Sequence, residues 1–324
     1  MTWKFLMTAP ALGEAGREVL AAAGCEVDYL QTANDAAEVE QLMASRAYDA
    51  VISRTATLSA TAINSCPSLK IICKHGVGVT NIDVAAASKH GIPVLTTPAT
   101  NAQSVAELAI ALMLSAARRL PFFQSEIAAE RWTRSGDGIE LHGKTLGLVG
   151  YGEIGRRVAR IAEALGMRIA FYDPAFSGAA EPGHQQCDSL EKLLRQSQVL
   201  SLHCPVNNAT RLLLNADTLA LLPPRAIVLN TSRGELIDEA PLAAALADGR
   251  LYAAGLDTFA VEPLPADHPF RTLGNVVMSP HIGGSTPEAL DAVARSAAQQ
   301  CLDYLQRQQL DRRACVNAAA LKLD

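Results

Sequence analysis

Short runs of β-branched residues alternate with helix-forming stretches along almost the whole chain, and this alternation restricts the possible folds more than any other feature. Strands that alternate with helices build βαβ units around a parallel sheet. The pattern occurs twice within 324 residues, a length that corresponds to about two domains. We therefore predict an α/β protein with two doubly wound parallel-sheet domains.

Each series of expected strands has its own part of the chain. The first comprises Lys4–Met7, Glu26–Leu30, Ala50–Ser53, Lys70–Lys74 and Pro93–Thr96, with helices at Gly13–Ala23 and Asn34–Arg46. The second comprises Thr145–Val149, Arg168–Tyr172, Val199–His203, Ala226–Asn230, Ala253–Thr258 and Val276–Ser279. Each series predicts one domain.

Two long helical segments lie outside these series. Asn101–Leu120 is expected to form a helix that joins the domains, and two arginines close it where the helix dipole favours positive charge. Ser104 and Glu107 have the S-x-x-E spacing of a capping box near its start. Pro287–Gln306 has helical periodicity with no strand after it, and the pattern does not decide which domain it completes.

Charge and cysteine content exclude several classes of protein. The formal net charge of −5 provides no overall basic field, so we expect neither a nucleic-acid nor a membrane partner. Seven cysteines, an odd number without CxxC spacing, predict neither a disulfide framework nor a metal site, and a reducing cytoplasm fits them best. Leu108–Ala117, the most apolar long stretch, has ten residues where a membrane span needs about 18 to 20, so we expect a buried helix there.

A glycine-rich loop follows directly on the expected strand Thr145–Val149. Gly150, Gly152 and Gly155 have the GxGxxG spacing, and a helical run begins after them. In such a loop the first glycine makes a tight turn, the second lets backbone N–H groups approach a pyrophosphate, and the third lets the helix pack on the strand. The sequence thus predicts a dinucleotide site, and a glycine-rich turn without a nucleotide is the alternative.

An acidic residue ends the next expected strand. Asp173 lies 18 residues after Gly155, a spacing that places a carboxylate where it can accept hydrogen bonds from an adenosine ribose. The same carboxylate would repel the 2′-phosphate of NADP, and no arginine follows it to neutralise that charge. We therefore expect NAD as the cofactor.

Polar residues follow the later strands. Arg233 lies beyond the strand Ala226–Asn230, at the strand end where ligands of an open α/β sheet bind, and could hold a carboxylate through two hydrogen bonds. The alternative is a surface arginine paired with Glu235 or Asp238. Asp257 ends the next strand, where a cap or turn aspartate is the ordinary interpretation.

Glu262 and His281 are separated by 19 residues and lie on different loops. Histidine is the side chain best suited to moving a proton near neutral pH, and a carboxylate beside it would favour the imidazolium and orient the ring. Each residue alone is weak evidence, because a loop glutamate is usually solvated and a histidine before two glycines is often a turn residue.

Four motifs in order resemble the D-2-hydroxyacid dehydrogenase family over nearly the whole chain. They are LVGYGEIG at 148–155, NTSRG at 230–234, VEPL at 261–264 and SPHIGG at 279–284. The resemblance implies that Arg233, Glu262 and His281 are catalytic. It also implies that the cofactor is bound by Gly150, Gly152, Glu153, Ile154, Gly155, Asp173, His203, Cys204, Pro205, Thr210, Thr231, Ser232, Asp257, Gly283 and Gly284, with Asp257 at the nicotinamide.

The resemblance also implies a domain organisation. A Rossmann NAD domain at 99–286 would be inserted in a flavodoxin-like substrate domain made of 1–98 and 287–324. The helix region 101–120 would form the interface of a homodimer.

The first domain contains a loop similar to the family's carboxylate-binding segment, G-x-G-x-D-N-I-D. In or next to this loop lie Lys74, His75, Val77 and Gly78. Thr80 replaces the usual aspartate, a change that bears on the rigidity of the loop. Backbone N–H groups would bind the carboxylate. The resemblance adds Asn101 to the substrate residues. His75 is as well interpreted as a structural turn histidine.

The family resemblance implies reversible oxidation of a 2-hydroxy acid, with hydride passing to the nicotinamide while His281 takes the hydroxyl proton. Arg54 and Arg134 resemble positions that phosphoglycerate dehydrogenases use for the substrate phosphate, or they are solvated arginines. Phosphoglycerate dehydrogenase-like activity is the main expectation. Glyoxylate or hydroxypyruvate reduction and a sulfolactate-type dehydrogenase are the alternatives.

A different class of function shares this fold and the same three catalytic residues. The chain could be an NADH-sensing binding module similar to the C-terminal-binding corepressors. The absence of a long polar tail or a basic tract in the sequence argues against it.

Overall fold

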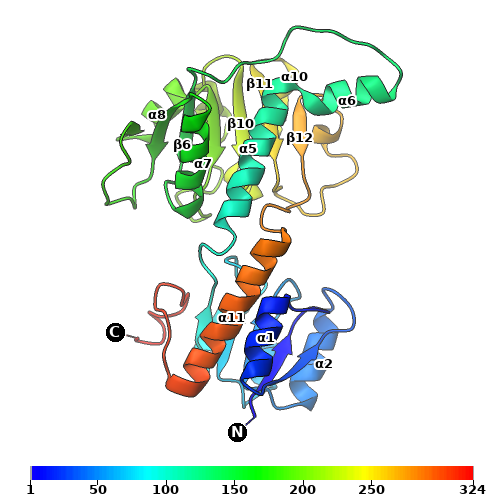
Figure 1. Ribbon diagram of the computed structural model, residues 1–324, viewed down its shortest axis with the longest axis vertical. Helices are drawn as coiled ribbons and strands as arrows, with labels where there is room; N and C mark the ends of the chain where they lie inside the picture. The colour runs from blue at the N-terminus through cyan, green and yellow to red at the C-terminus, as the bar shows by residue number, and fades with distance from the viewer. Residues whose placement is uncertain (1, 324) are drawn as a thin grey trace. The chain divides into compact units, whose positions relative to one another are not determined.

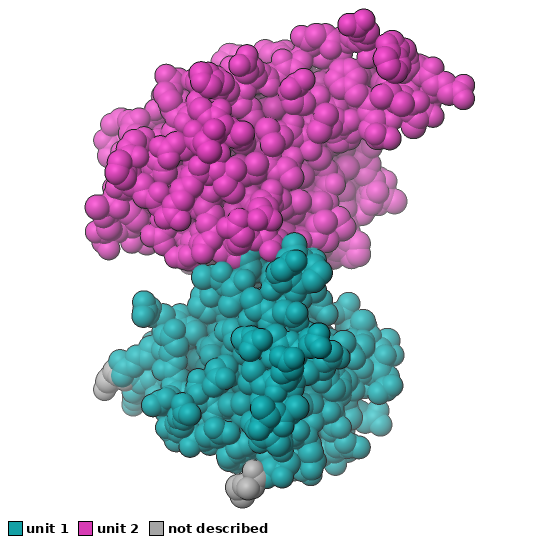
Figure 2. All heavy atoms as spheres, viewed as in Figure 1, with its two compact units in different colours: residues 1–101, 285–324 teal, residues 102–284 magenta. Residues whose placement is uncertain are grey.

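The computed structural model describes residues 2–323 and divides the chain into two compact units. Unit 1 consists of residues 1–101 and 285–324, and unit 2 of residues 102–284 (Figure 2). The first expected domain boundary follows residue 98, three residues before the division after residue 101. The second follows residue 286, two residues after the division at 284. Each unit is an α/β layered structure with its own sheet.

Unit 1 is built on a five-stranded sheet in the order β2-β1-β3-β4-β5, in which every strand pair is parallel. This is the flavodoxin-like order that the family resemblance implies. Its elements are β1 (Lys4–Met7), α1 (Glu14–Ala22), β2 (Glu26–Tyr29), α2 (Ala36–Ser45), β3 (Ala50–Ser53), α3 (Ala60–Asn64), β4 (Ile71–Lys74), α4 (Val84–Lys89), β5 (Val94–Leu95) and α11 (Pro287–Arg307).

Side chains of the unit 1 strands alternate between two buried clusters, one on each face of the sheet. On β1, Leu6 packs in the cluster that includes α2, whereas Phe5 and Met7 pack in the cluster that includes α11. Helix α11 lies beside α1 (Figure 1). The structure thus assigns the segment Pro287–Gln306, which the sequence pattern left open, to unit 1.

Unit 2 is built on a seven-stranded parallel sheet in the order β12-β11-β10-β9-β6-β7-β8. The order reverses at β6 and β9, as in a Rossmann fold. Its elements are α5 (Ala102–Arg118), α6 (Leu120–Ala128), β6 (Thr145–Val149), α7 (Glu153–Ala164), β7 (Arg168–Tyr172), β8 (His184–Gln186), α8 (Leu190–Gln196), β9 (Val199–Leu202), α9 (Ala216–Ala220), β10 (Ala226–Asn230), η1 (Gly234–Leu236), α10 (Glu239–Ala247), β11 (Leu251–Leu256), η2 (Pro269–Arg271) and β12 (Val276–Met278).

Helix α5 packs against β10, β11 and β12 and against α7, on one face of the unit 2 sheet (Figure 1). The expected helix at 101–120 is confirmed, but the capping box is wrong. The helix begins at Ala102, so Ser104 lies within its first turn. Ala102, Val105 and Ala106 are buried, and their packing places the helix start before the serine.

Helix α5 ends at Arg118, and α6 begins two residues later. Arg119 between them has a left-handed backbone (φ +53°), and Pro121 lies in the first turn of α6. The sequence analysis also missed β8, because that strand has no apolar run. His184 is buried but Gln185 and Gln186 are exposed, as fits a strand at the edge of the sheet that pairs only with β7.

Candidate active site

The glycine loop joins β6 to α7 at the point where the strand order of unit 2 reverses, which is where open α/β sheets bind ligands. Gly150 has a φ of +96°, and a Cβ built there would lie 2.7 Å from the carbonyl carbon of His203. A Cβ at Gly155 would overlap the Gly150 carbonyl oxygen. A Cβ at Gly152 would meet nothing, so open space adjoins the N-terminus of α7. Gly150 and Gly155 therefore stand where a side chain would not fit, and Gly152 leaves room beside the helix N-terminus.

Three buried polar atoms at neighbouring strand ends have no hydrogen-bond partner within residues 2–323. They are His203 Nδ1, after β9, Thr231 Oγ1, after β10, and Thr258 Oγ1, after β11. The other ring nitrogen of His203 lies 2.8 Å from the Ser201 hydroxyl, and burial lowers the pKa of His203 to about 4, so its ring is neutral at neutral pH. Unpaired buried polar atoms beside an open helix N-terminus fit a polar, phosphate-bearing cofactor such as NAD.

Asp173 ends β7 and lies next to the glycine loop. Its Oδ2 accepts the backbone N–H of Tyr151 at 2.9 Å, and its Oδ1 accepts that of Ala175 at 2.9 Å. A carboxylate has about four lone-pair sites, so both oxygens can still accept a hydroxyl donor. The geometry fits the role of ribose acceptor that the spacing predicts for Asp173.

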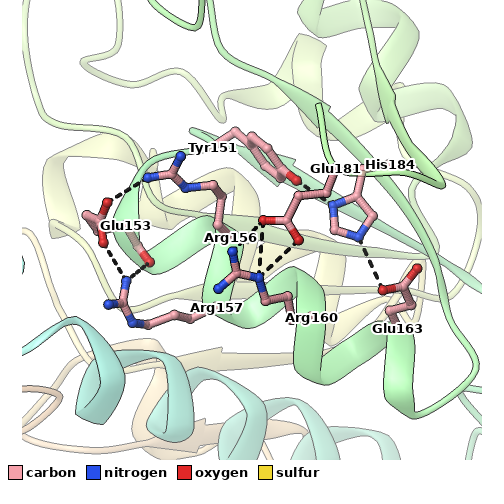
Figure 3. Close-up of polar contacts among 8 residues, drawn as sticks. All are labelled: Tyr151, Glu153, Arg156, Arg157, Arg160, Glu163, Glu181 and His184. Carbon is pink, nitrogen blue, oxygen red and sulfur yellow. Dashed lines mark hydrogen bonds and ion pairs between the residues drawn. The ribbon is translucent and has the colours of Figure 1, made fainter. Parts of the chain in front are cut away.

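The side chain of Tyr151 anchors the glycine loop to the sheet. Its ring stacks on Phe171 with centroids 3.8 Å apart, and its hydroxyl is hydrogen-bonded to His184 Nδ1 (Figure 3). The other ring nitrogen of His184 lies 3.6 Å from Glu163. Burial raises the pKa of Tyr151, so the phenol stays protonated. The sequence analysis gave Tyr151 no role, because its partner lies in the strand that it missed.

Charged residues surround the start of α7 in Figure 3. Glu153 lies 2.6 Å from both Arg156 and Arg157, and the hydrogen bond from Arg157 holds the pKa of Glu153 below its usual range. Ile154, which follows, packs on the apolar core of unit 2. The side chains of both residues are therefore occupied within the protein, and a cofactor would meet their backbone N–H groups.

Further expected cofactor residues lie on the loops after β9 and β10. The Ser232 hydroxyl donates to the Cys204 carbonyl at 2.7 Å, and the Thr210 hydroxyl donates to the Pro205 carbonyl at 2.6 Å. Burial raises the pKa of the Cys204 thiol to about 11, so it is no thiolate at neutral pH.

Arg233 stands immediately before η1, in extended backbone after β10. The Asn230 side chain accepts the Ser232 N–H and donates to the Arg233 carbonyl, which fixes the loop. The Arg233 guanidinium donates to the Ser232 carbonyl at 2.7 Å and makes no ion pair within residues 2–323, so it is not paired with Glu235 or Asp238. Its charge is therefore available for an anionic ligand.

Glu262 and His281 lie in contact although they come from different loops. Glu262 Oε2 is 2.8 Å from His281 Nδ1, and Glu262 Oε1 accepts the Phe259 N–H at 3.0 Å. Both side chains are partly exposed, 37% for Glu262 and 44% for His281. An ionised glutamate can only accept, so Nδ1 carries a proton and Nε2 is free to exchange one.

Asp257 holds the turn that carries His281. One carboxylate oxygen accepts the Ser279 hydroxyl at 2.6 Å and the Ile282 N–H at 2.9 Å, and the other accepts the Gly283 N–H at 2.8 Å. Asp257 is 1% exposed, and His281 has a left-handed backbone (φ +55°). These contacts give Asp257 the local turn-capping role that the sequence offered as its ordinary interpretation.

The expected substrate residues of unit 1 lie around the end of β4. Lys74 is buried, and its ammonium donates to the Arg54 carbonyl and to Asn81 Oδ1, the latter at 2.6 Å. The Asn81 side chain also donates to the Ser53 hydroxyl and the Ala56 carbonyl. Asn81, which the sequence analysis passed over, thus ties the loop after Lys74 to β3 even though Thr80 replaces an aspartate.

His75 follows Lys74 and is largely buried. Burial, and then the positive charge of Arg54, lowers the pKa of His75 to about 4, so its ring is neutral at neutral pH. Val77 is half exposed, and Gly78 beside it is partly exposed. The loop therefore offers a neutral imidazole, a nearby cation and accessible backbone.

The remaining expected residues occupy the ends of unit 2 and the segment before it. Gly283 is buried and Gly284 partly buried, directly after the His281 turn. Asn101 is the last residue before α5. Arg134 is exposed and has no hydrogen bond or ion pair within the described part of the chain.

All seven cysteines are free thiols. Across residues 2–323, no three His, Cys, Asp or Glu side chains gather in a way that could hold a metal ion. Among the helices of the same range, none has both the length and the apolar character that crossing a membrane requires.

Comparison with known proteins shows the family of the chain. Residues 110–283 match the model of the D-isomer specific 2-hydroxyacid dehydrogenase, NAD binding domain. The chain is 39% identical over 279 residues to D-3-phosphoglycerate dehydrogenase from Methanocaldococcus jannaschii, covering 85% of this chain and 53% of that protein. It is 44% identical over 246 residues to hydroxypyruvate reductase from Thermotoga maritima, covering 74% of this chain and 79% of that protein.

A solved structure covers both units. The NAD⁺-bound 3-phosphoglycerate dehydrogenase of Entamoeba histolytica has a TM-score of 0.83 and 29% identity, over 98% of this chain and 99% of that one. The chain spans about half the length of the Methanocaldococcus dehydrogenase that it matches.

Proposed function

The chain belongs to the D-isomer specific 2-hydroxyacid dehydrogenase family, and on that basis we propose that it is an NAD-dependent oxidoreductase interconverting a D-2-hydroxy acid and its 2-oxo acid. The observation that carries the proposal is the 2.8 Å contact between Glu262 and His281. A carboxylate-oriented histidine can take a proton from a hydroxyl group and return it to a carbonyl.

In the proposed mechanism His281 Nε2 accepts the substrate hydroxyl proton as the hydroxy acid is oxidised. Glu262 holds the ring and stabilises the imidazolium that forms. Arg233 binds the substrate carboxylate and polarises the oxygen on the reacting carbon, so its loss would weaken both binding and the chemical step. NAD, when bound, supplies the hydride acceptor.

For the cofactor we propose the residues that adjoin the reversal point of the unit 2 sheet. The backbone of Gly152, Glu153 and Ile154 at the start of α7 would bind the pyrophosphate. Asp173 would accept the adenosine ribose hydroxyls, and its charge would disfavour NADP. The unpaired Thr231 hydroxyl and His203 Nδ1, with the loop at Cys204, Pro205 and Thr210, supply further polar contacts. Gly283 and Gly284 would allow close approach, and Asp257 would reach the nicotinamide.

Phosphoglycerate dehydrogenase-like activity is the substrate class that we propose first. The guanidinium groups of Arg54 and Arg134, which make no ion pair within residues 2–323, suit a second anionic group, and the backbone of Val77 and Gly78 suits the carboxylate. Lys74 would act through the loop that it fixes, with His75 and Asn101 bordering the substrate. Hydroxypyruvate reduction is the second candidate, since the Thermotoga relative of that name is 44% identical.

We also propose a homodimer formed through α5 and α6. No residue of α6 is buried, and Leu120 and Ile127 are 53% and 59% exposed. A cavity of about 740 Å³ lined in part by Leu114, Leu120 and Phe123 adjoins them. Exposed apolar residues gathered beside a cavity are typical of a protein interface. The free thiols fit a reducing compartment, and we propose the cytoplasm.

The test is oxidation of NADH by the purified protein with hydroxypyruvate, glyoxylate, pyruvate, phosphohydroxypyruvate and sulfopyruvate. We expect turnover of at least one acid, strongest with phosphohydroxypyruvate, and a loss of about 100- to 10,000-fold in His281→Ala with NADH affinity unchanged. Near-native turnover in His281→Ala would overturn the mechanism. Tight NADH binding without turnover of any acid would favour an NADH-sensing binding module.

A further inference from the structure

Unit 2 contains a second carboxylate–histidine pair, close to the first and outside the residues assigned so far. Glu239 is the first residue of α10, and its Oε2 lies 3.2 Å from His268 Nε2. Both side chains are largely buried, with 17% and 15% exposed. His268 Nδ1 accepts the Phe270 N–H at 3.3 Å, so the neutral ring carries its proton on Nε2 and donates it to Glu239.

The two pairs hold consecutive amides of one turn. The Phe259 N–H donates to Glu262 Oε1 at 3.0 Å, and the next N–H, that of Ala260, donates to Glu239 Oε1 at 2.9 Å. Glu239 therefore fixes the direction of the peptide that follows Phe259, and through it the position of Glu262. Charged acceptors make stronger hydrogen bonds with amides than neutral ones do.

Packing restrains the first part of this turn, since the Phe259 side chain is buried in the apolar core of unit 2. The Phe259–Ala260 peptide lies against Gly234. A hollow of about 350 Å³ also borders the turn and is lined by Ile237, Ala260 and Pro269 among others. Ala260 and Glu239 both line this hollow, and the hydrogen bond between them is a further contact that holds the turn on this side.

We propose that Glu239, oriented by His268, is a positioning residue that sets the contact of Glu262 with His281. The predicted effect on kcat rests on the proposed function. The predicted contact of Glu262 with His281 does not, because it can be measured without turnover. Glu239 touches no reacting atom in this account. It acts through the Ala260 amide alone.

The experiment compares Glu239→Ala, Glu239→Gln and the control Asp267→Asn in the full chain. Asp267 is an exposed acid beside His268 and has no side-chain hydrogen bond or ion pair within residues 2–323, so its variant removes one charge from the same segment. We expect Glu239→Ala to lower kcat by about 10- to 100-fold with the Kd for NADH unchanged. Glu239→Gln keeps an acceptor for Ala260 and should recover most of kcat, and Asp267→Asn should match the wild type.

Nitrogen NMR of ¹⁵N-histidine-labelled protein reports which ring nitrogen of His281 carries the proton, with His281→Ala to assign the signal. We expect the Nδ1–H form in the wild type and in Glu239→Gln, and its loss in Glu239→Ala. Unchanged kcat and an unchanged His281 form in Glu239→Ala would overturn the inference. If the wild type shows the Nδ1–H form but reduces none of the acids, and Glu239→Ala loses that form, the proposed function would be overturned while the positioning role would be supported.

Discussion

At the scale of single residues, Asp257 and Asn230 show how the site is held. Asp257 uses both carboxylate oxygens to bind the turn around His281, and Asn230 fixes the loop of Arg233 with its amide. Buried polar groups of this kind are costly unless every partner is present. The loops that carry the proposed catalytic residues are therefore defined by a few specific hydrogen bonds.

Asp173 is the residue on which the expected cofactor preference depends. In Asp173→Asn the amide oxygen still accepts the Tyr151 N–H, while the negative charge is removed. We expect the KM for NAD to rise by about 10-fold and the preference for NAD over NADP to shrink, because a charged acceptor for the ribose is lost. Steady-state kinetics with both cofactors measures this. The exposed Asp188→Asn in the same unit is the control, and equal use of NAD and NADP by the wild type would contradict the role of Asp173.

Gly234 is a position where only glycine fits. A Cβ there would overlap the backbone of Phe259 and Ala260, the turn that carries Glu262. We expect Gly234→Ala to lower the free energy of unfolding by about 1–3 kcal/mol and to reduce kcat, because the turn must shift. Urea unfolding and kinetics check both effects. Gly274→Ala is the control, because a Cβ there meets nothing within 4 Å, and it should leave the free energy of unfolding and kcat unchanged. If Gly234→Ala also changes neither quantity, the turn can shift without cost and the prediction is wrong.

At the scale of elements, the strands were easier to predict than the edges of the sheets. Expected bounds for β1, β3, β6, β7 and β10 match the structure, because these strands lie inside the sheets and most of their residues are apolar and buried. The polar edge strand β8 was missed. Helix α5 was expected at its correct place, but tertiary packing of its first turn overrode the local capping signal.

Helix α6 carries the prediction about assembly. We expect the double variant Leu120→Asp and Ile127→Asp to convert a dimer to a monomer, because two charges would be buried in an apolar interface. Analytical ultracentrifugation at several protein concentrations measures the change. Val316→Asp, at a comparably exposed apolar residue of unit 1, is the control and should remain dimeric. A wild-type monomer at all concentrations would exclude this interface.

At the scale of the whole molecule, one histidine in each unit has a lowered pKa that makes stability depend on pH. Burial lowers the pKa of His75 in unit 1 and of His203 in unit 2 to about 4 in the folded protein. Between about pH 6.5 and 4 the unfolded chain binds more protons at these sites than the folded one, so stability falls as the pH falls through this range.

We expect each histidine to contribute a decrease of up to roughly 1.4 kcal/mol per pH unit, and none above about pH 7. Urea midpoints measured from pH 7.5 to 4.5 for the wild type, His75→Asn and His203→Asn test this by their slopes. Each variant should show a shallower slope than the wild type. Parallel slopes in all three proteins would show that the rings are solvated in the folded state.

The fold class, the glycine loop and the candidate residues Arg233, Glu262 and His281 could all be predicted from the sequence. These features depend on local pattern: the period of apolar residues, the spacing of glycines, and polar residues at strand ends. Order along the chain was enough to identify them as members of one family.

Tertiary structure alone decided which of these residues touch. Four contacts join segments that are 19 to 33 residues apart in sequence. Glu262 pairs with His281, Asp257 accepts a backbone N–H of the His281 turn, Tyr151 is hydrogen-bonded to His184, and Glu239 accepts the Ala260 N–H. Parallel strands bring distant loops to one sheet edge, and the packing there, which no local pattern encodes, selects the partners.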